Sequence, residues 1–274
     1  MFNSISRSQL DDAAALRLVC FPYAGGGTAG YHRWRPLMPD TVDLVPVSLP
    51  GHDGRLNEAL YTDIKALANA LREDLSRFAL DKPFVLLGHS MGAVLAFEIA
   101  RSLRRHGQAM PRLMVLTGCP PPHLIVITEP LHKLPDDELM EVLQSRYGGI
   151  PAVIRENPEL WKLLAPPMRA DFEMIDTYRY DEEPPLDVPM LVLGGAEDAA
   201  VSAAKIMDWR KHTTQDCSVR LLPGNHFFLF SAAPANDEGG QPAQQVKRDE
   251  PTPGLRVILE RLEQCATEIG SGDG

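Results

Sequence analysis

The sequence lacks the features that would direct it to a membrane or to a polyanion. Its apolar runs are all much shorter than the ~20 residues that a membrane-spanning helix needs. Lysine and arginine number 27 against 37 aspartates and glutamates, for a formal net charge of −10. The basic residues form no long run. We therefore expect binding neither to nucleic acid nor to a membrane.

Cysteine is scarce, and so are groupings of metal ligands. The four cysteines are dispersed without C-x-x-C spacing, which favours reduced structural thiols: Cys20, Cys119, Cys217 and Cys265. The eight histidines are dispersed as well, and no H-E-x-x-H motif occurs. We expect no metal site and no bound cofactor. The first ten residues lack the apolar core of a signal peptide, so we expect a cytoplasmic protein.

Residues 84–97 read as an apolar strand, a sharp turn and an apolar helix. The turn, Gly88–Gly92, has the pattern G-x-S-x-G with Ser90 at its centre. This pattern is typical of the nucleophile elbow of α/β-hydrolases, where a strained turn exposes the serine hydroxyl above the carboxyl ends of the strands. A Cβ at Gly88 or Gly92 would collide with the neighbouring strand or helix. The alternative is an ordinary turn in which Ser90 only caps the helix.

The rest of the pattern predicts an α/β-hydrolase fold, with a mostly parallel central sheet flanked by helices. Apolar runs predict the strands 16–21, 42–48, 85–87, 113–116, 188–193 and 217–222. Helical sequence interrupts the alternation at about 120–185, and we expect helices there at 134–143, 159–165 and 168–180. We interpret this segment as a lid inserted in a single domain, residues 1–274. The composition of residues 231–253 predicts a disordered insertion.

The chain order of α/β-hydrolases, nucleophile then acid then histidine, selects partners for Ser90. The acid should lie after the next-to-last strand, where we prefer Asp198 and keep Glu197 as the alternative. The base should follow the last strand, which favours His226 over His212. In this hypothesis Ser90 attacks an acyl carbonyl, His226 carries the proton and Asp198 orients the imidazole.

A glycine-rich loop, residues 22–30, follows the first predicted strand. Its spacing matches no phosphate-binding motif. In α/β-hydrolases a loop at this place supplies one amide of the oxyanion hole, and the residue after the nucleophile supplies the other. We therefore assign the oxyanion hole to the amides of Ala24 and Met91, with Tyr23 as a less favoured donor.

A family resemblance extends from about residue 16 to residue 230. The segments that carry it are Cys20–Gly26, Trp34, Leu49–Arg55, Gly88–Ala93, Pro122–His123, Leu134–Leu139, Leu164–Asp171, Tyr178–Tyr180, Gly194–Gly195 with Asp198 and Val201, and Gly224–Phe228. Together they resemble the type II thioesterases of nonribosomal peptide and polyketide synthesis. The resemblance implies a stand-alone hydrolase that removes stalled acyl or aminoacyl groups from phosphopantetheinyl carrier proteins. It also implies a triad at Ser90, Asp198 and His226.

The sequence departs from that family at two places. The family usually continues Pro-Gly with Arg-Glu, whereas Pro50-Gly51 continues here with His52 and Asp53. Because these two residues precede the nucleophile, we interpret them as rim residues and not as a catalytic dyad. The family also runs almost directly from its His-Phe-Phe segment into its last helix, whereas residues 231–253 intervene here.

Other functions remain open on the sequence. A medium-chain acyl-carrier-protein thioesterase or a carboxylesterase would use the same fold, and activity on acyl carriers, oxygen esters and acyl-CoA would separate them. Acyl transfer to an acceptor other than water would show in product analysis. A catalytically silent relative that binds a ligand or partner is the non-enzyme alternative. Failure of a fluorophosphonate probe to label Ser90 would favour it.

Overall fold

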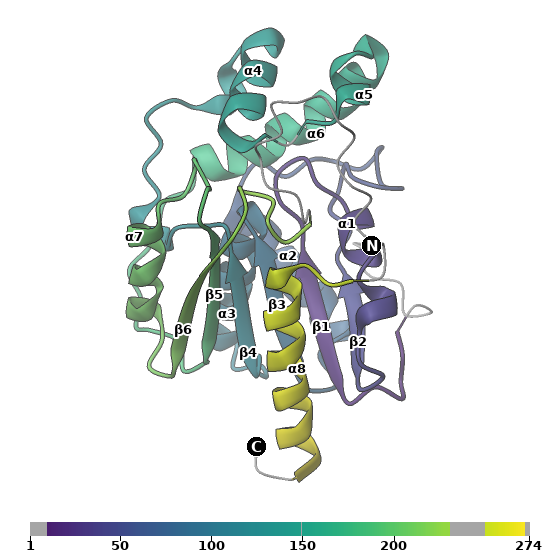
Figure 1. The fold of residues 1–274 in the computed structure, drawn as a ribbon, viewed down its shortest axis with the longest axis vertical. Helices are drawn as coiled ribbons and strands as arrows, with labels where there is room; N and C mark the ends of the chain where they lie inside the picture. Colours follow the sequence, from purple (N-terminus) through teal and green to yellow (C-terminus); the bar gives the residue numbers. More distant parts are fainter. Residues whose placement is uncertain (1–9, 149, 231–249, 272–274) are drawn as a thin grey trace.

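A six-stranded parallel sheet organises the described residues, which are 10–148, 150–230 and 250–271 of the computed structural model (Figure 1). The strands are β1 Leu16–Phe21, β2 Val42–Pro46, β3 Phe84–His89, β4 Leu113–Thr117, β5 Met190–Gly195 and β6 Cys217–Leu222. Their order is β2-β1-β3-β4-β5-β6, and each neighbouring pair is parallel. The predicted α/β fold with a mostly parallel sheet is therefore confirmed.

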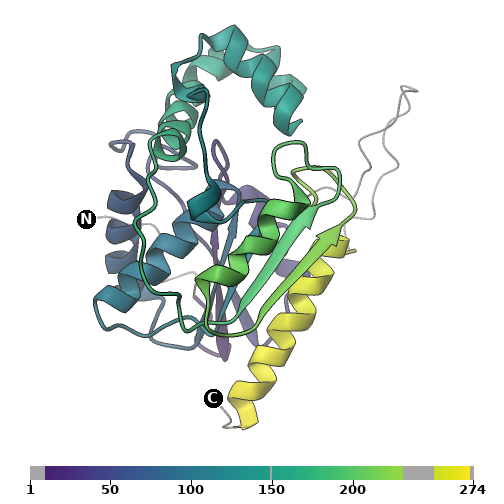
Figure 2. The same cartoon turned by 90° about the vertical axis from the view of Figure 1, so that its left-hand side faces the viewer.

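Strands β1, β3, β4 and β5 are mostly apolar and buried along their whole length, because helices cover both faces of the sheet. In β3, Phe84 and Leu86 belong to one hydrophobic core, while Val85 and Leu87 belong to the other. The first face carries α2 (Ile64–Phe78), α3 (Met91–Arg105) and α7 (Ala203–Ile206). The second carries α1 (Ala29–His32) and α8 (Pro253–Ser271), as Figures 1 and 2 show.

Short 3₁₀ helices complete the described secondary structure: η2 Arg35–Leu37, η3 Pro122–Leu124, η4 Leu131–Lys133 and η5 Met207–His212. None of the helices in the described ranges combines the length and the apolar character that crossing a membrane requires. The predicted disordered segment, 231–253, falls mostly on residues 231–249, outside the described residues, and stays a prediction. Its last residue, Pro253, begins α8.

Three helices between β4 and β5 form a separate layer above one end of the sheet (Figures 1 and 2). They are α4 Asp136–Tyr147, α5 Ala152–Arg155 and α6 Pro158–Asp176. They bury a small core of their own, formed by Leu131, Leu139, Leu143, Ile150, Trp161, Ala165, Met168 and Phe172. Residues 120–185 are called the lid below.

The prediction of two helices at 159–165 and 168–180 is wrong, because α6 is one helix that runs through Pro166 and Pro167. A proline inside a helix removes one N–H and so leaves the carbonyl four residues earlier without its helical partner. Here those carbonyls belong to Lys162 and Leu163, whose residues are exposed to solvent. Pro167 is buried. Packing of the lid therefore offsets the intrinsic cost of the two prolines.

Candidate active site

Ser90 lies at the turn between β3 and α3 in a backbone conformation that few L-residues adopt. Its φ is 54° and its ψ is −117°. A Cβ at Gly88 would lie 2.0 Å from the carbonyl oxygen of Gly92, and a Cβ at Gly92 would lie 2.2 Å from the carbonyl oxygen of Phe21. The predicted steric need for both glycines is therefore confirmed. The turn leaves Ser90 partly exposed among buried neighbours.

His226 and Asp198 approach each other at the carboxyl ends of β5 and β6. His226 Nδ1 lies 2.8 Å from Asp198 Oδ2, and both side chains are almost completely buried. The other carboxylate oxygen, Oδ1, accepts hydrogen bonds from the amides of Ala200 (2.8 Å) and Val201 (3.2 Å). Because a carboxylate only accepts hydrogen bonds, this geometry places the proton of the neutral imidazole on Nδ1 and leaves Nε2 as the free base.

The two residues that the sequence left as alternatives lie elsewhere. The carboxylate of Glu197 accepts a hydrogen bond from the amide of Gly224. His212 is buried, and its Nε2 lies 2.7 Å from His123 Nδ1. Burial and the neighbouring His123 lower the pKa of His212 to about 4. The geometry therefore joins Asp198, and not Glu197, to a histidine that shares a cavity with Ser90.

His89, next to Ser90, is a fully buried neutral imidazole. The Thr117 hydroxyl donates to the carbonyl oxygen of Gly88 (3.1 Å), so its oxygen accepts from His89 Nδ1 at 2.9 Å. Burial, together with the nearby His226, lowers the pKa of His89 well below its usual range. The amide of Ser90 donates to the carbonyl oxygen of Thr117 at 2.8 Å. His89 and Thr117 therefore support the turn.

The amides of Ala24 and Met91 make no hydrogen bond within the described residues. Met91 is the first residue of α3, where amides have no helical acceptor and the helix dipole favours negative charge. Ala24 lies in the glycine-rich loop and lines the same cavities as Ser90. The less favoured donor, Tyr23, packs its ring edge-on against Phe227, at 4.9 Å between centroids.

Two cavities of about 230 Å³ and 320 Å³ meet at Ser90, in the turn between β3 and α3. Five residues line both of them: Ala24, Ser90, Tyr147, Phe172 and His226. The smaller cavity lies between the glycine-rich loop and the lid, and the larger one extends along residues 118–131. Tyr147 packs its ring over His226, at 4.9 Å between centroids. Residues 120–185 therefore contact His226 and line both cavities beside Ser90.

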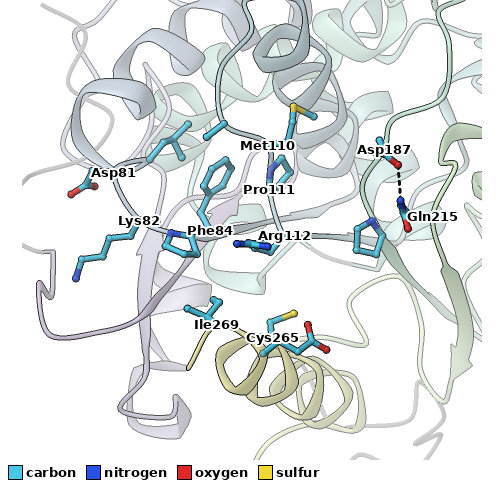
Figure 3. A pocket seen from close by; sticks show the side chains of 15 residues that line it. Asp81, Lys82, Phe84, Met110, Pro111, Arg112, Asp187, Gln215, Cys265 and Ile269 are labelled. Carbon is cyan, nitrogen blue, oxygen red and sulfur yellow. Dashed lines mark hydrogen bonds between the residues drawn. The ribbon is translucent and has the colours of Figure 1, made fainter. Parts of the chain in front are cut away.

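A larger cavity of about 640 Å³ opens at the opposite end of the sheet. Figure 3 shows Cys265 and Ile269 of α8 facing Phe84, Met110 and Arg112, which lie at or before the first residues of β3 and β4. Burial raises the pKa of the Cys265 thiol, which disfavours the reactive thiolate. Nothing in this cavity therefore favours a cysteine nucleophile at Cys265.

The structure gives contacts to two residues near the site, His52, which the sequence placed only at the rim, and Asp171, to which it gave no role. Asp171 lies on α6 of the lid, and its Oδ2 accepts a hydrogen bond from the amide of Gly25 at 2.7 Å. His52 Nε2 lies 2.9 Å from the same oxygen. The sequence did mark both positions, because His52 departs from the family pattern and Asp171 ends one of the segments that carry the resemblance. It did not show that His52 and Asp171 contact each other.

A family model described as the thioesterase domain matches residues 16–236. Among relatives, the gramicidin S biosynthesis protein GrsT of Aneurinibacillus migulanus is 32% identical over 225 residues, which cover 82% of this chain and 87% of that protein. The medium-chain S-acyl fatty acid synthase thioesterase of Homo sapiens is 33% identical over 233 residues, which cover 82% of this chain and 84% of that protein.

Two solved structures extend the likeness to three dimensions. The thioesterase RedJ from the prodiginine pathway of Streptomyces coelicolor is 34% identical with a TM-score of 0.79, covering 97% of this chain and 94% of RedJ. YbtT, a type II thioesterase from the yersiniabactin NRPS/PKS pathway, is 32% identical with a TM-score of 0.72. That match covers 80% of this chain and 89% of YbtT.

Proposed function

The chain belongs to the thioesterase family and hydrolyses thioesters, and we propose that its substrates are acyl and aminoacyl groups on the phosphopantetheine arm of carrier proteins. Its sequence-based assignment to the type II thioesterases of nonribosomal peptide and polyketide synthesis is confirmed by these relatives. The enzyme assignment removes the non-catalytic alternative. Its task in this proposal is to remove stalled or aberrant groups that block an assembly line.

The proposed mechanism uses Ser90 as the nucleophile. His226 Nε2 accepts the serine proton while Ser90 attacks the thioester carbonyl, and Asp198 stabilises the imidazolium that forms. The amides of Ala24 and Met91 donate to the oxyanion of the tetrahedral intermediate. The carbon–sulfur bond then breaks, the imidazolium of His226 passes its proton to the departing sulfur, and phosphopantetheine leaves as the free thiol. Water, activated by His226, hydrolyses the acyl ester on Ser90 and regenerates the enzyme.

A thioester suits this set of groups. The leaving thiolate needs little help from an acid, so His226 acts chiefly as a base, first on Ser90 and then on water. The observation that carries the proposal is the contact of 2.8 Å between His226 Nδ1 and Asp198 Oδ2, near the partly exposed Ser90. It orients the imidazole for both steps.

The carrier protein is proposed to dock on the lid. With a net charge of −10, the chain offers no long-range attraction to an acidic partner, so docking must depend on local contacts. The lid carries apolar side chains that are largely exposed, among them Val126 at 75% and Val153 at 64%. Such side chains are candidates for a protein interface. The four free cysteines support the cytoplasmic location that we also propose.

The proposal is tested by loading a carrier protein with acetyl, aminoacyl or hexanoyl groups and following its unloading by intact-mass spectrometry. Wild type should unload the carrier, and Ser90→Ala should be slower by ~10³-fold or more, because the nucleophile is lost. Ser218→Ala removes an exposed hydroxyl on β6 and should match wild type. Equal rates for Ser90→Ala and wild type would exclude Ser90 as the nucleophile.

A second candidate function is the release of medium-chain fatty acids, which the 33% identity to the human medium-chain enzyme favours. The same assay separates the two functions when decanoyl and longer chains are added to the series. Turnover that peaks at decanoyl and ignores aminoacyl groups would support the second candidate. Broad turnover of short acyl and aminoacyl groups would support editing.

A further inference from the structure

One oxygen atom of Asp171 joins three separate segments of the chain. It belongs to the lid helix α6, accepts the hydrogen bond of the Gly25 amide and lies 2.9 Å from His52 Nε2. The side chains of Asp171 and His52 are only 4% and 7% exposed. A buried carboxylate is costly unless it is paired. These two contacts provide its partners, and both lie outside the lid.

The contacts of His52 favour the charged form of its imidazole. His52 Nδ1 lies 3.1 Å from the carbonyl oxygen of Pro50, which only accepts hydrogen bonds, so Nδ1 carries a proton. Nε2 lies 2.9 Å from a carboxylate oxygen of Asp171, a contact that favours a second proton on the ring and hence an imidazolium. Burial lowers the pKa of His52, but the nearby Asp171 and, more weakly, Asp53 outweigh it, and the pKa is raised. Arg55, a cation three residues after His52, forms an ion pair with Glu58.

These contacts act on the loop that contains Ala24. The amide of Gly26 donates to the carbonyl oxygen of Tyr23 at 2.8 Å. In a trans peptide this carbonyl points opposite to the amide of Ala24, so the bond sets the direction of that amide. The peptide on the other side of Ala24 is held by the bond from Gly25 to Asp171. Ala24 is therefore fixed from both sides, once within the loop and once by the lid.

Gly25 could not be held in this way with a side chain. Its φ is +73°, and a Cβ there would lie 2.9 Å from the terminal carbon of Met168 on the lid. Asp53, the residue after His52, binds the other end of the glycine-rich loop. The carboxylate of Asp53 accepts from the amide of Thr28, at 3.3 Å and 3.2 Å to its two oxygens. The departure from the family pattern at positions 52 and 53 therefore falls on one residue that contacts Asp171 and one that binds the glycine-rich loop directly.

We propose that Asp171 and His52 are positioning residues that hold the Gly25 amide and so keep the Ala24 amide directed at the oxyanion. The inference rests on the proposed role of Ala24 in the oxyanion hole. Asp171 is bound to the loop and not to His226, so it acts through Ala24 and not on the reacting atoms. Because Asp171 belongs to α6, movement of the lid away from the sheet releases the loop. Lid closure and completion of the oxyanion hole are one event.

The first test removes the carboxylate with Asp171→Ala, using unloading of an acyl carrier and fluorophosphonate labelling of Ser90 as readouts. We expect kcat to fall ~10- to 100-fold, because one oxyanion donor loses its fixed direction, while KM changes less than ~3-fold. Labelling of Ser90 should slow by a similar factor, since the probe also develops negative oxygen. Arg169→Met is the matched control. It removes the ion pair of α6 with Asp136 but leaves the loop contacts, and kcat should stay within ~2-fold of wild type.

The second test changes the charge of His52. The imidazolium is lost as pH rises above its raised pKa, so the kcat of wild type should fall on the alkaline side. His52→Arg keeps a cation beside Asp171 at any accessible pH, so it should retain most of kcat and lose this alkaline fall. His52→Gln should have a low kcat at all pH values.

A wild-type kcat in Asp171→Ala, or an unchanged alkaline fall in His52→Arg, would overturn the proposal. An equal loss of kcat in Arg169→Met would also overturn it, because general lid destabilisation would then explain the effect. If the carrier-protein substrate were wrong instead, the outcome would differ from these. Wild type would then leave the acyl carrier loaded while the probe still labelled Ser90, and the labelling rates would still test the roles of Asp171 and His52.

Discussion

At the scale of single residues, Asp198 uses its two carboxylate oxygens for different purposes. Oδ1 accepts from the amides of Ala200 and Val201, which fixes the side chain, and Oδ2 faces His226 Nδ1. Glu197, one position earlier, turns to the amide of Gly224. Adjacent carboxylates in one loop therefore have separate partners, and only Asp198 can set the tautomer of His226.

We predict that Asp198→Asn lowers kcat by about 10³–10⁴-fold, as the loss of this orienting carboxylate does in serine hydrolases. The amide retains the shape of the side chain but no longer enforces a proton on Nδ1 of His226. Steady-state release of free thiol measures the effect. Glu197→Gln is the control and should keep kcat within ~3-fold of wild type, because a carboxamide oxygen still accepts the bond from Gly224. Similar activity of Asp198→Asn and Glu197→Gln would refute this role.

At the scale of elements, the turn between β3 and α3 brings α3 so close to the end of β1 and the start of the glycine-rich loop that no side chain fits at Gly92. The carbonyl oxygens of Phe21 and Pro22 would lie 2.2 Å and 2.7 Å from a Cβ at Gly92. Those carbonyls belong to the end of β1 and the start of the glycine-rich loop. The first turn of α3 therefore lies against the backbone that leads to Ala24, and Gly92 sets the spacing between this turn and the loop.

We expect Gly92→Ala to push that loop away and to destabilise the fold. Overpacking a close contact typically costs about 1–3 kcal/mol in the free energy of unfolding. Loss of one oxyanion donor lowers kcat by ~10²–10³-fold. Urea unfolding and thiol release measure the two effects. Gly270→Ala in α8, where nothing lies within 4 Å of the new Cβ, should leave kcat unchanged and add up to ~1 kcal/mol of stability. A fully active, stable Gly92→Ala would argue against the steric account.

At the scale of the whole molecule, buried neutral histidines make stability depend on pH. Burial and the neighbouring His123 lower the pKa of His212 to about 4, whereas an unfolded histidine has a pKa of about 6.5. Between these values the unfolded chain binds more protons than the folded one. The free energy of unfolding therefore falls as pH decreases from about 6.5 to 4. His89, with its pKa also lowered, acts in the same direction.

We predict that His212 alone accounts for a loss on the order of 3 kcal/mol in the free energy of unfolding by pH 4. His212→Gln cannot be protonated and should flatten this part of the pH profile, even if it is less stable at neutral pH. Chemical denaturation at several pH values provides the profile. The same substitution at His32, which is exposed, should keep the wild-type slope. An unchanged slope in His212→Gln would show that His212 does not carry the effect.

The sequence by itself determined the sheet, the turn at Ser90 and the family. These features depend on neighbours in the chain: apolar runs predict strands, and the glycines at 88 and 92 are spaced for one tight turn. Chain order also predicted Asp198 and His226 as partners of Ser90. The order alone kept Glu197 and His212 open, because it specifies the loop but not the direction of a side chain.

The tertiary structure alone decided which distant groups meet. Gly25 and Asp171 are 146 residues apart in sequence, and no local pattern relates them. Their contact depends on how the lid packs on the sheet, and so does the continuity of α6 through Pro166 and Pro167. Propensities and spacing describe one segment at a time, whereas these features follow from packing between segments. The contact between Asp171, His52 and the glycine-rich loop therefore became visible only in the folded chain.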